Sequence, residues 1–505
     1  MVPRIRHIPL FLALAGFMAL FMMFPALHGL VHQRFAESRA FFYSGTLGLI
    51  TVIMVQITLS SRPRRARGGL TDLAALLATF AVLPLFLALP FYEGVGTTTF
   101  LNAYVEMVSS LTTTGASLFP PERLSDTMHL WRAQVGWIGG LIMWVAAAAI
   151  LAPLNLGGFE VTASAEPGRG DTPLDRYGVT DANRRLQRSL QLLAPIYITL
   201  TAVLWLCLVI AGDRPLVALS HAMSALATSG ISPVGGVAGA NSGMVGEFLI
   251  FLFLFFALSR LTFSSDTLTS ARPGLLHDPE FRIGLLLIAG VPLILFLRHW
   301  LAAFDVDEVE NFVAAGRALW GSIFTVLSFL TTTGFESTGW SDARDWSGLS
   351  SPGIILLGLS LIGGGVATTA GGVKLLRVYA LYLNGLREME QLVHPHSVGR
   401  SSGQGRRIRR NGAFVAWVYF MLFAMSLAFI IAAFTATGTE FENAVVLSIA
   451  ALSTTGPLIT TAAESPISLV EMSAAGKLIL SASMVLGRLE MLAIIVLANP
   501  ALWRD

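Results

Sequence analysis

Residues 100–115 read FLNAYVEMVSSLTTTG, and residues 441–456 read FENAVVLSIAALSTTG. Both stretches begin with Phe-x-Asn-Ala and end in Thr-Thr-Gly, and in both the Asn lies 13 residues ahead of the Gly. A helix needs about 20 apolar residues to cross the hydrocarbon of a bilayer, and these stretches are shorter. They predict two equivalent short helices, each running into the same polar loop.

The closing tripeptide, Thr-(Thr/Ser)-Gly, occurs four times and nowhere else in the chain. Each copy ends a short apolar stretch, and the four glycines are 115, 104 and 122 residues apart. One copy could be a simple helix stop, but four copies in one register indicate an internal repeat. The short stretches are 99–111, 216–227, 313–330 and 441–452, and the copies are Thr113-Thr114-Gly115, Thr228-Ser229-Gly230, Thr332-Thr333-Gly334 and Thr454-Thr455-Gly456.

The composition places this repeat in a membrane. Of the 505 residues, 13% are charged and 54% are hydrophobic, whereas soluble domains carry about 25% charged residues. These values exclude an ordinary cytosolic protein and a disordered chain. The single cysteine, Cys207, excludes an internal disulfide and a thiolate metal cluster. A net charge of +2 gives no reason to expect nucleic acid as a partner. We expect an all-α polytopic membrane protein.

Ten longer apolar stretches can each cross the bilayer as a helix. The first follows Arg4 and Arg6, as in a signal peptide, but its length and the lack of a small-residue cleavage site favour a retained helix. The short stretches fall between the later spans, which predicts two leading helices and then four units of span, short helix, loop and span. The ten ranges are 8–30, 41–60, 70–91, 134–154, 189–211, 244–263, 283–302, 353–383, 412–436 and 476–498.

The chain divides accordingly into five segments. Residues 1–68 hold the two extra N-terminal helices, and the four pore repeats occupy 69–160, 161–270, 271–400 and 401–505. Repeats arranged about one axis along the membrane normal would bring the four loops together at the centre.

The residue types in the four loops suit a cation. Backbone carbonyls can replace the water of a desolvated ion, and Thr and Ser add hydroxyl oxygens. Glycine permits the backbone angles that direct carbonyls inward, and the C-terminal end of a short helix brings partial negative charge. We predict that the twelve residues of the four tripeptides form a filter that binds K⁺. The alternative is a set of outer amphipathic helices that merely stop at the tripeptide.

The distribution of arginine predicts the orientation of the chain. Positively charged residues concentrate in the connections that lie on the same side as both termini, which the positive-inside rule assigns to the cytoplasm. The two densest groups are Arg62, Arg64, Arg65 and Arg67, and Arg406, Arg407, Arg409 and Arg410.

A run of glycines interrupts the eighth apolar stretch. Five glycines lie within residues 363–372, here named the glycine segment, and each weakens a helix by about 1 kcal/mol relative to Ala. The segment is either a kink that allows close helix packing or an unwound obstruction in the pore, and the residues alone do not decide between them.

Together these features resemble the Trk/Ktr/HKT superfamily of cation transporters, most closely the bacterial TrkH type. The resemblance covers nearly the whole chain. Besides the four glycines and the two leading helices, it rests on Ile362-Gly363-Gly364-Gly365, Ala370-Gly371-Gly372-Val373-Lys374 and Gly487-Arg488-Leu489-Glu490. It implies four pseudo-symmetric repeats around one pore, and potassium uptake across a bacterial inner membrane. Plant relatives with Ser in the first loop are more Na⁺-permeable, so Gly115 implies a preference for K⁺.

Two loops depart from the pattern of the family. The fourth continues Gly456-Pro457-Leu458, where TrkH-like chains commonly have a second Gly after the Pro. The third continues with Glu336, which places an acid at the pore mouth. Both departures leave the degree of discrimination between K⁺ and Na⁺ open.

The resemblance also implies a gate made by an intramembrane loop beneath the filter. Arg488 is expected near the middle of the tenth span, where a charge normally faces a cavity or a partner. Glu490 is a poor partner because residues two apart on a helix do not face each other, and an ion pair with another acid is the alternative. We expect Lys374 to extend to the cytoplasmic surface and His221 to be a packed core residue. The predicted gate residues are Gly363, Gly364, Gly365, Thr368, Thr369, Gly371, Gly372 and Arg488.

No nucleotide-binding fingerprint is present, so no cofactor is expected on this chain. TrkH-type proteins are homodimers and pair with a separate cytosolic TrkA-like ring that binds a nucleotide, NAD or ATP/ADP. The resemblance therefore implies such a ring on the arginine-rich inner connections. The alternative is that these arginines only fix topology and contact anionic lipid.

Two other classes of function compete with a potassium pathway. A membrane-embedded enzyme would need a catalytic constellation, and no metalloprotease, nucleophile-elbow or phosphate-loop motif occurs. A secondary transporter of another cation, coupled to Na⁺ or H⁺, or of an organic solute would want ionisable residues at the midplane and two-fold repetition. Neither coupling nor symport can be decided from the sequence.

Overall fold

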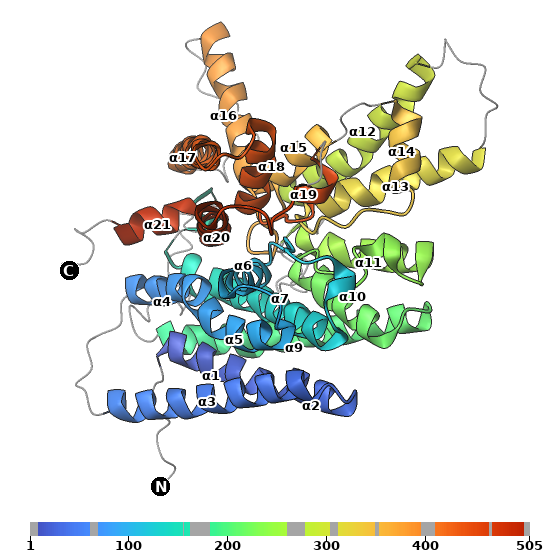
Figure 1. Cartoon of the computed structure of the whole chain (residues 1–505). Helices are drawn as coiled ribbons and strands as arrows, with labels where there is room; N and C mark the ends of the chain where they lie inside the picture. Colours follow the sequence, from blue (N-terminus) through green and yellow to red (C-terminus); the bar gives the residue numbers. More distant parts are fainter. Residues whose placement is uncertain are drawn as a thin grey trace.

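The computed structural model describes residues 9–60, 69–154, 156–161, 182–259, 278–302, 312–348, 353–394, 410–463 and 467–498. All regular secondary structure in these ranges is helical, as the hydropathy predicts. Figure 1 shows the chain running around a common centre, from blue through green and yellow to red.

The two leading spans form a pair at one edge of the molecule. The first consists of α1 (Leu10–Phe21) and α2 (Met23–Val31), and the second is α3 (Phe35–Ser60). α3 packs against both α1 and α2 (Figure 1). Its opposite side exposes large apolar side chains such as Leu47 and Ile57. A contiguous exposed apolar face of this kind is suited to contact with lipid.

The first repeat has the predicted order of elements. α4 (Gly69–Ala81) and α5 (Leu83–Val95) together form its first span, and α6 (Phe100–Leu111) is the short helix. The second span is α7 (Asp126–Ala146), which continues as a π-helical turn over Ala147–Leu151.

The second repeat follows the same order with a shorter final helix. Its elements are α9 (Ala182–Ile210), the short helix α10 (Pro215–Ala227), and α11 (Gly243–Leu254), which ends in a 3₁₀ turn over Phe255–Ala257. The sixth predicted span, 244–263, is therefore only partly helical in the part that the structure describes.

The third repeat contains the interrupted span. α12 (Pro279–Ala302) precedes the short helix α13 (Phe312–Leu330), and α14 (Trp340–Ser347) follows the loop. α15 (Gly353–Ile362) and α16 (Leu375–Val393) are separated by the glycine segment. The predicted break in the eighth span is confirmed.

The fourth repeat ends in a sharp bend. α17 (Arg410–Ala436) leads to the short helix α18 (Phe441–Leu452), and α19 (Leu458–Thr461) is a single turn directly after the loop. α20 (Ala474–Leu489) and α21 (Met491–Ala498) make an angle of 96° with each other. The tenth predicted span, 476–498, is therefore broken, because Glu490 adopts a φ of +64° that an α-helix cannot continue through.

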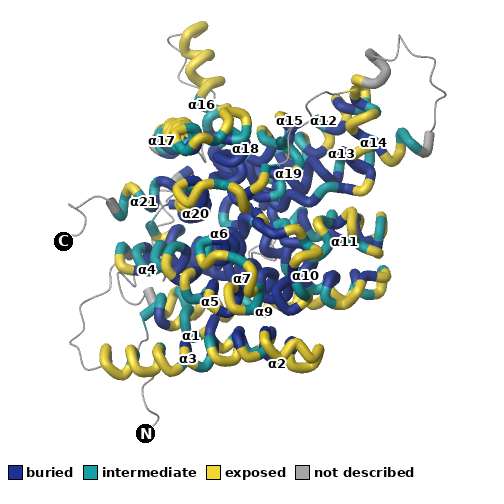
Figure 2. The backbone as a smooth tube through the Cα atoms, in the orientation of Figure 1, coloured by how far each residue is buried: buried dark blue, intermediate teal, exposed yellow. Residues whose placement is uncertain are grey.

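Seven of the ten predicted spans are continuous helices long and apolar enough to cross a membrane, counted over the described residues. The four units also close on themselves. The first contacts the second through α7 and α10, the second contacts the third through α11 and α13, the third contacts the fourth through α15 and α18, and the fourth returns to the first through α20 and α6. In Figure 2 the buried residues concentrate at this shared centre.

Candidate ion pathway

All four short helices end in the same way. Thr113 donates its N–H to the Ser110 carbonyl, and Thr114 donates to Ser109, both at 2.9 Å. The other three helices repeat both hydrogen bonds between 2.8 and 3.3 Å. This pair of hydrogen bonds satisfies the last carbonyls of a helix. It normally requires a residue in the left-handed conformation just after the helix. Positions counted from the four glycines are therefore structurally equivalent.

The left-handed position is held by the first threonine of each tripeptide. Its φ is +56° at Thr113, +48° at Thr228, +57° at Thr332 and +54° at Thr454. A positive φ in a β-branched residue is a genuine outlier, and a left-handed residue other than glycine costs about 1–2 kcal/mol. Four such residues at one position mean that the side chain matters there, because glycine would fit the backbone more easily.

The second residue of each tripeptide points its hydroxyl back into the protein. Thr114 Oγ1 lies 2.8 Å from the hydroxyl of Thr112, and the equivalent pairs in the third and fourth loops are both 3.2 Å apart. In the second loop Ser229 donates to the Ser224 hydroxyl at 3.1 Å. These hydroxyls hold the loops in place, so we assign the ion-facing role to other atoms.

The first threonines differ in what their hydroxyls contact. Thr113 Oγ1 and Thr454 Oγ1 are buried and have no hydrogen-bond partner among the described residues. Thr228 Oγ1 donates to the neighbouring Ala227 carbonyl at 2.8 Å. Thr332 Oγ1 accepts a hydrogen bond from outside the loop, described below. A buried hydroxyl without a partner is uncommon in proteins, and here it is an available oxygen ligand.

The four loops are close-packed into one ring, here the four-loop ring, made of the twelve tripeptide residues. A methyl group on Gly115 would lie 1.8 Å from the Ser229 carbonyl oxygen, and one on Gly230 would lie 2.3 Å from that of Thr333. Each loop meets the next in chain order, and Gly456 closes the ring by donating its N–H to the Thr114 carbonyl at 2.6 Å. Only glycine fits these approaches.

The glycine segment folds back on itself between α15 and α16. Just after it, Val373 donates its N–H to the Leu361 carbonyl at 2.9 Å. A methyl group on Gly363 would lie 2.1 Å from the Gly371 carbonyl oxygen. The two ends of the segment are therefore side by side, and its middle residues form a narrow projection.

This projection lies against the four-loop ring. Gly371 donates its N–H to Thr332 Oγ1 at 2.8 Å, and the Thr369 hydroxyl donates to the Leu226 carbonyl at 3.1 Å. A methyl group on Gly371 would lie 2.2 Å from the Ser453 carbonyl oxygen. The segment thus contacts the ends of the second, third and fourth short helices at once, without room for a larger residue.

Arg488 holds this projection from the other side. Its guanidinium donates to the Thr369 carbonyl at 2.6 Å, while Nε and one terminal nitrogen have no hydrogen-bond partner among the described residues. The side chain is buried. It lies near the middle of the tenth predicted span, but α20 ends one residue later, at Leu489, and the chain bends away.

Glu490 pairs with Arg377 and not with Arg488. The two side chains form a buried ion pair of 2.7 Å, and the Arg377 guanidinium also lies 3.7 Å from the ring centroid of Tyr419. The group joins α16, α17 and the bend after α20. It fixes the end of α16 that carries the glycine segment.

Lys374 does not extend to the surface, so that expectation was wrong. Its side chain is buried, and Nζ donates to the Ala370 carbonyl in the glycine segment. The backbone at Lys374 has a φ of +85°. The side chain therefore folds back over the segment, where its ammonium group bonds a backbone carbonyl.

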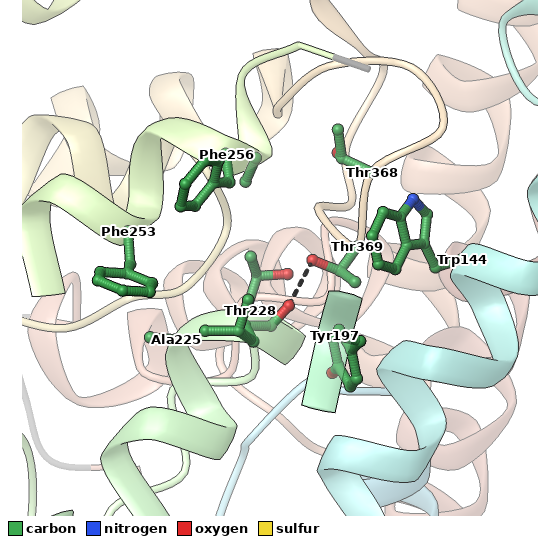
Figure 3. Close-up of a pocket in the computed structure, with 10 residues that line it drawn as sticks. Trp144, Tyr197, Ala225, Thr228, Phe253, Phe256, Thr368 and Thr369 are labelled. Atoms are coloured by element: carbon green, nitrogen blue, oxygen red, sulfur yellow. Dashed lines mark hydrogen bonds between the residues drawn. The ribbon is translucent and has the colours of Figure 1, made fainter. Parts of the chain in front are cut away.

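A small cavity lies beside the projection. Thr368 and Thr369 of the glycine segment line it together with Trp144, Tyr197 and Thr228 (Figure 3).

Two further predicted positions lie next to the ring. His221 is fully buried, with Nε2 2.8 Å from the Ser232 hydroxyl and its ring packed against Phe335, which confirms a core histidine. Glu336 accepts a hydrogen bond from the Thr461 hydroxyl, so the acid of the third loop contacts the end of the fourth.

Sequence reasoning missed two buried carboxylates that hold the loops. Glu106 of α6 lies 2.6 Å from the guanidinium of Arg132. Glu247 of α11 accepts from the hydroxyl of Ser337 at 2.6 Å and from the N–H of Thr338 at 2.7 Å. A lone acid inside an apolar helix was a usable signal, because such residues are rare and commonly functional in membranes.

The fold and the ring define a class of protein, namely a multi-pass membrane transport protein and not an enzyme. Its central feature is one ring of oxygen-bearing loops at the ends of four short helices. The chain belongs to the TrkH family, described as cation transport proteins, whose sequence model matches residues 95–504.

Several relatives resemble the chain over most of its length. It is 30% identical over 493 residues to the Trk system potassium uptake protein TrkH of Salmonella typhimurium, with 96% of both chains covered. It is 30% identical over 424 residues to the protein of that name from Escherichia coli K12, with 83% of both covered. The crystal structure of the potassium transporter TrkH from Vibrio parahaemolyticus superimposes with a TM-score of 0.80 at 25% identity, covering 98% of this chain and 99% of that one.

Proposed function

We propose that the chain takes up K⁺ across a bacterial inner membrane through the four-loop ring. The observation that carries this proposal is the closed ring itself, in which four helix ends and their carbonyls meet. The buried hydroxyls of Thr113 and Thr454, which lack partners among the described residues, add oxygen ligands. The names of the relatives, potassium uptake proteins, support K⁺ as the ion.

We further propose that the glycine segment and Arg488 form the gate. The segment lies against the ring, and its Gly371 N–H donates a hydrogen bond to the Thr332 hydroxyl oxygen. Arg488 holds it there through the Thr369 carbonyl and adds a positive charge that repels a passing cation. In this proposal, opening requires the segment to leave the ring.

A flux experiment tests the proposed function against its alternatives. Purified protein in proteoliposomes should take up ⁸⁶Rb⁺, a K⁺ substitute, and excess K⁺ should compete with it. If the protein were an enzyme or a transporter of organic solutes, no such flux would be expected. Imposed Na⁺ or pH gradients would accelerate ⁸⁶Rb⁺ uptake only in a coupled symporter, which separates symport from channel-like flux.

We propose regulation by a cytosolic ring protein that binds nucleotide, and assembly as a homodimer, with both termini in the cytoplasm. α16 stands out from the other helices in Figure 1, and residues 385–394 at its end are exposed. This end leads toward Arg406, Arg407 and Arg409, which lie outside the described residues. Copurification with such a ring should be lost when these arginines and Arg410 are replaced by Gln. Unchanged copurification would leave them only a lipid-contacting or topological role.

A further inference from the structure

The inference concerns one helix position, nine residues before each filter glycine. Because the four short helices end with the same hydrogen bonds, this position has the same place on each of them. It is occupied by Glu106, His221, Thr325 and Leu447. All four side chains are buried. Three of them are polar, and each of the three contacts the segment by which the chain leaves its own loop.

The first repeat has the strongest contact. Glu106 accepts the N–H of Leu118 at 2.8 Å and the Ser117 hydroxyl at 3.3 Å. Arg132 of the following span neutralises the carboxylate at 2.6 Å. Bonds to a charged acceptor are roughly twice as strong as bonds between neutral groups. The Ser109 hydroxyl, one turn further along α6, also holds the loop through the Ala116 carbonyl at 2.6 Å.

The second and third repeats make the same connection with weaker groups. His221 Nε2 lies 2.8 Å from the Ser232 hydroxyl, two residues after Gly230. The Thr325 hydroxyl accepts the N–H of Ser337 at 3.3 Å, three residues after Gly334. The exit of the third loop is also held by Glu247 from the neighbouring repeat.

The fourth repeat lacks the connection. Leu447 has no polar atom, and after Gly456 the chain turns at once into α19. A hydrogen bond from Thr461 of α19 to Glu336 of the third loop holds this exit instead. The repeats therefore use a paired carboxylate, an imidazole, a hydroxyl and an apolar group at one equivalent place.

We propose that Glu106 is a positioning residue for ion selection, and that this helix position sets how firmly each loop of the ring is held. The proposal rests on the proposed function of the ring as a K⁺ filter. Gly115 is in close contact with the second loop. If the residues that follow Gly115 move, the first loop must therefore move relative to the second, and the ring changes shape. A ring held at fixed size selects by the fit and number of its oxygen ligands, and a loosened ring can contract around a smaller ion.

Two double variants test this proposal without leaving an unpaired buried charge. Glu106→Leu with Arg132→Met gives the first repeat the apolar group of the fourth. Glu106→Gln with Arg132→Met has the same net charge but keeps an oxygen for the Leu118 N–H. The ratio of ⁸⁶Rb⁺ to ²²Na⁺ flux should fall about tenfold in the first, which corresponds to about 1.4 kcal/mol. It should stay within about twofold of the parent in the second.

The matched control is Leu447→Met, which changes the same position where no bond is made and should leave the ratio unaltered. Stabilisation is the second readout, since a bound ion raises the melting temperature. The melting temperature should rise more in K⁺ than in Na⁺ for the parent and the Gln variant, and equally in both ions for the Leu variant.

Each outcome bears on the proposal. Equal flux ratios in both double variants, whether high or low, overturn it, because the bond to Leu118 is then not what matters. If the Leu variant does not fold, Thr325→Val removes the corresponding uncharged contact, and an unchanged ratio there overturns the proposal. Absence of ⁸⁶Rb⁺ flux in the parent protein would instead overturn the proposed function. If the parent and both double variants all favour ⁸⁶Rb⁺ over ²²Na⁺, the role of Glu106 is overturned and the proposed function of the ring is not.

Discussion

At the scale of single residues, the site depends on threonines in an unfavourable backbone conformation. Each of the four left-handed threonines costs about 1–2 kcal/mol relative to a conformation that suits it. Strain of this kind persists where the surroundings impose it, and it is concentrated at functional sites. The hydroxyls of Thr113 and Thr454, buried without partners in the described part of the chain, are a direct reason to keep threonine.

Two substitutions at Thr113 separate the hydroxyl from the strain. Thr113→Ser keeps the oxygen and removes the crowded methyl group, so we expect flux within about twofold of the parent and equal or higher thermal stability. Thr113→Val keeps the shape and removes the oxygen, and should lower ⁸⁶Rb⁺ flux by about tenfold. Comparable flux in the two variants, each normalised to folded protein, would show that the hydroxyl is not a ligand.

Gly115→Ser tests the ring at its tightest contact. The new side chain would begin 1.8 Å from the Ser229 carbonyl oxygen, at a φ of +72°, so the first two loops must separate. We expect a lower ratio of K⁺ to Na⁺ permeability with the fold retained. Gly348→Ser is the control, because Gly348 has a similar φ of +58° with nothing within 4 Å. An unaltered ratio in a well-expressed Gly115→Ser protein would remove Gly115 from the filter.

At the scale of structural elements, the glycine segment is the part of the proposed pathway that we expect to move. It touches three short helices at the ring through Thr369 and Gly371. Its first half is held outside the ring, where Gly365 donates its N–H to the Ala257 carbonyl at 3.0 Å and Val366 donates to Glu280 at 2.9 Å. Its ends are fixed by α15 and by the Arg377–Glu490 pair at the start of α16. A non-helical segment that lies against the ring between two fixed ends is where we expect a gate.

Arg488→Ala should raise basal flux. A cation 4 Å from this guanidinium meets about 4 kcal/mol of repulsion at an effective dielectric of 20, and the variant also frees the Thr369 carbonyl. Deleting residues between Gly364 and Gly371 should raise flux as well. If both changes act on one barrier, their combination should fall short of the summed effects on log flux. A stable Arg488→Ala protein with the flux of the parent would contradict the gating role.

The Arg377–Glu490 pair should be important for stability. Arg377→Met leaves a buried carboxylate without its partner, which costs about 3–5 kcal/mol, so the melting temperature should drop sharply. Adding Glu490→Asn removes that charge and suits the positive φ at this position, and should recover most of the loss. If the double variant melts as low as the single one, the pair is not what holds the bend.

Much of this architecture follows from the sequence because its signals are local. The Thr-x-Gly copies predicted the helix ends, and the glycine run predicted the break before Lys374. The buried pairs Glu106–Arg132 and Arg377–Glu490 were not predicted, since partners 26 and 113 residues apart meet only through tertiary packing. The bend after Arg488 was missed for a related reason. Its positive φ lies at Glu490, a residue type that carries no turn signal.

At the scale of the whole molecule, function rests on closure. Each repeat contributes one loop, and each loop packs against the next until the fourth meets the first. No single repeat could build this ring, because each loop glycine lies against residues of other repeats. The leading helices α1–α3 lie outside this ring (Figure 1) and expose apolar side chains. They pack against α4, α5 and α7 of the first repeat.

The most direct test of a K⁺ path through the ring is to locate the ion. Crystals of the full chain grown in Rb⁺ would show its position by anomalous scattering. We predict Rb⁺ on the axis of the four-loop ring, within ligand distance of carbonyl oxygens from all four tripeptides, and its displacement by K⁺ but not by equal Na⁺. Rb⁺ bound elsewhere in a protein that conducts it, with none inside the ring, would contradict the account.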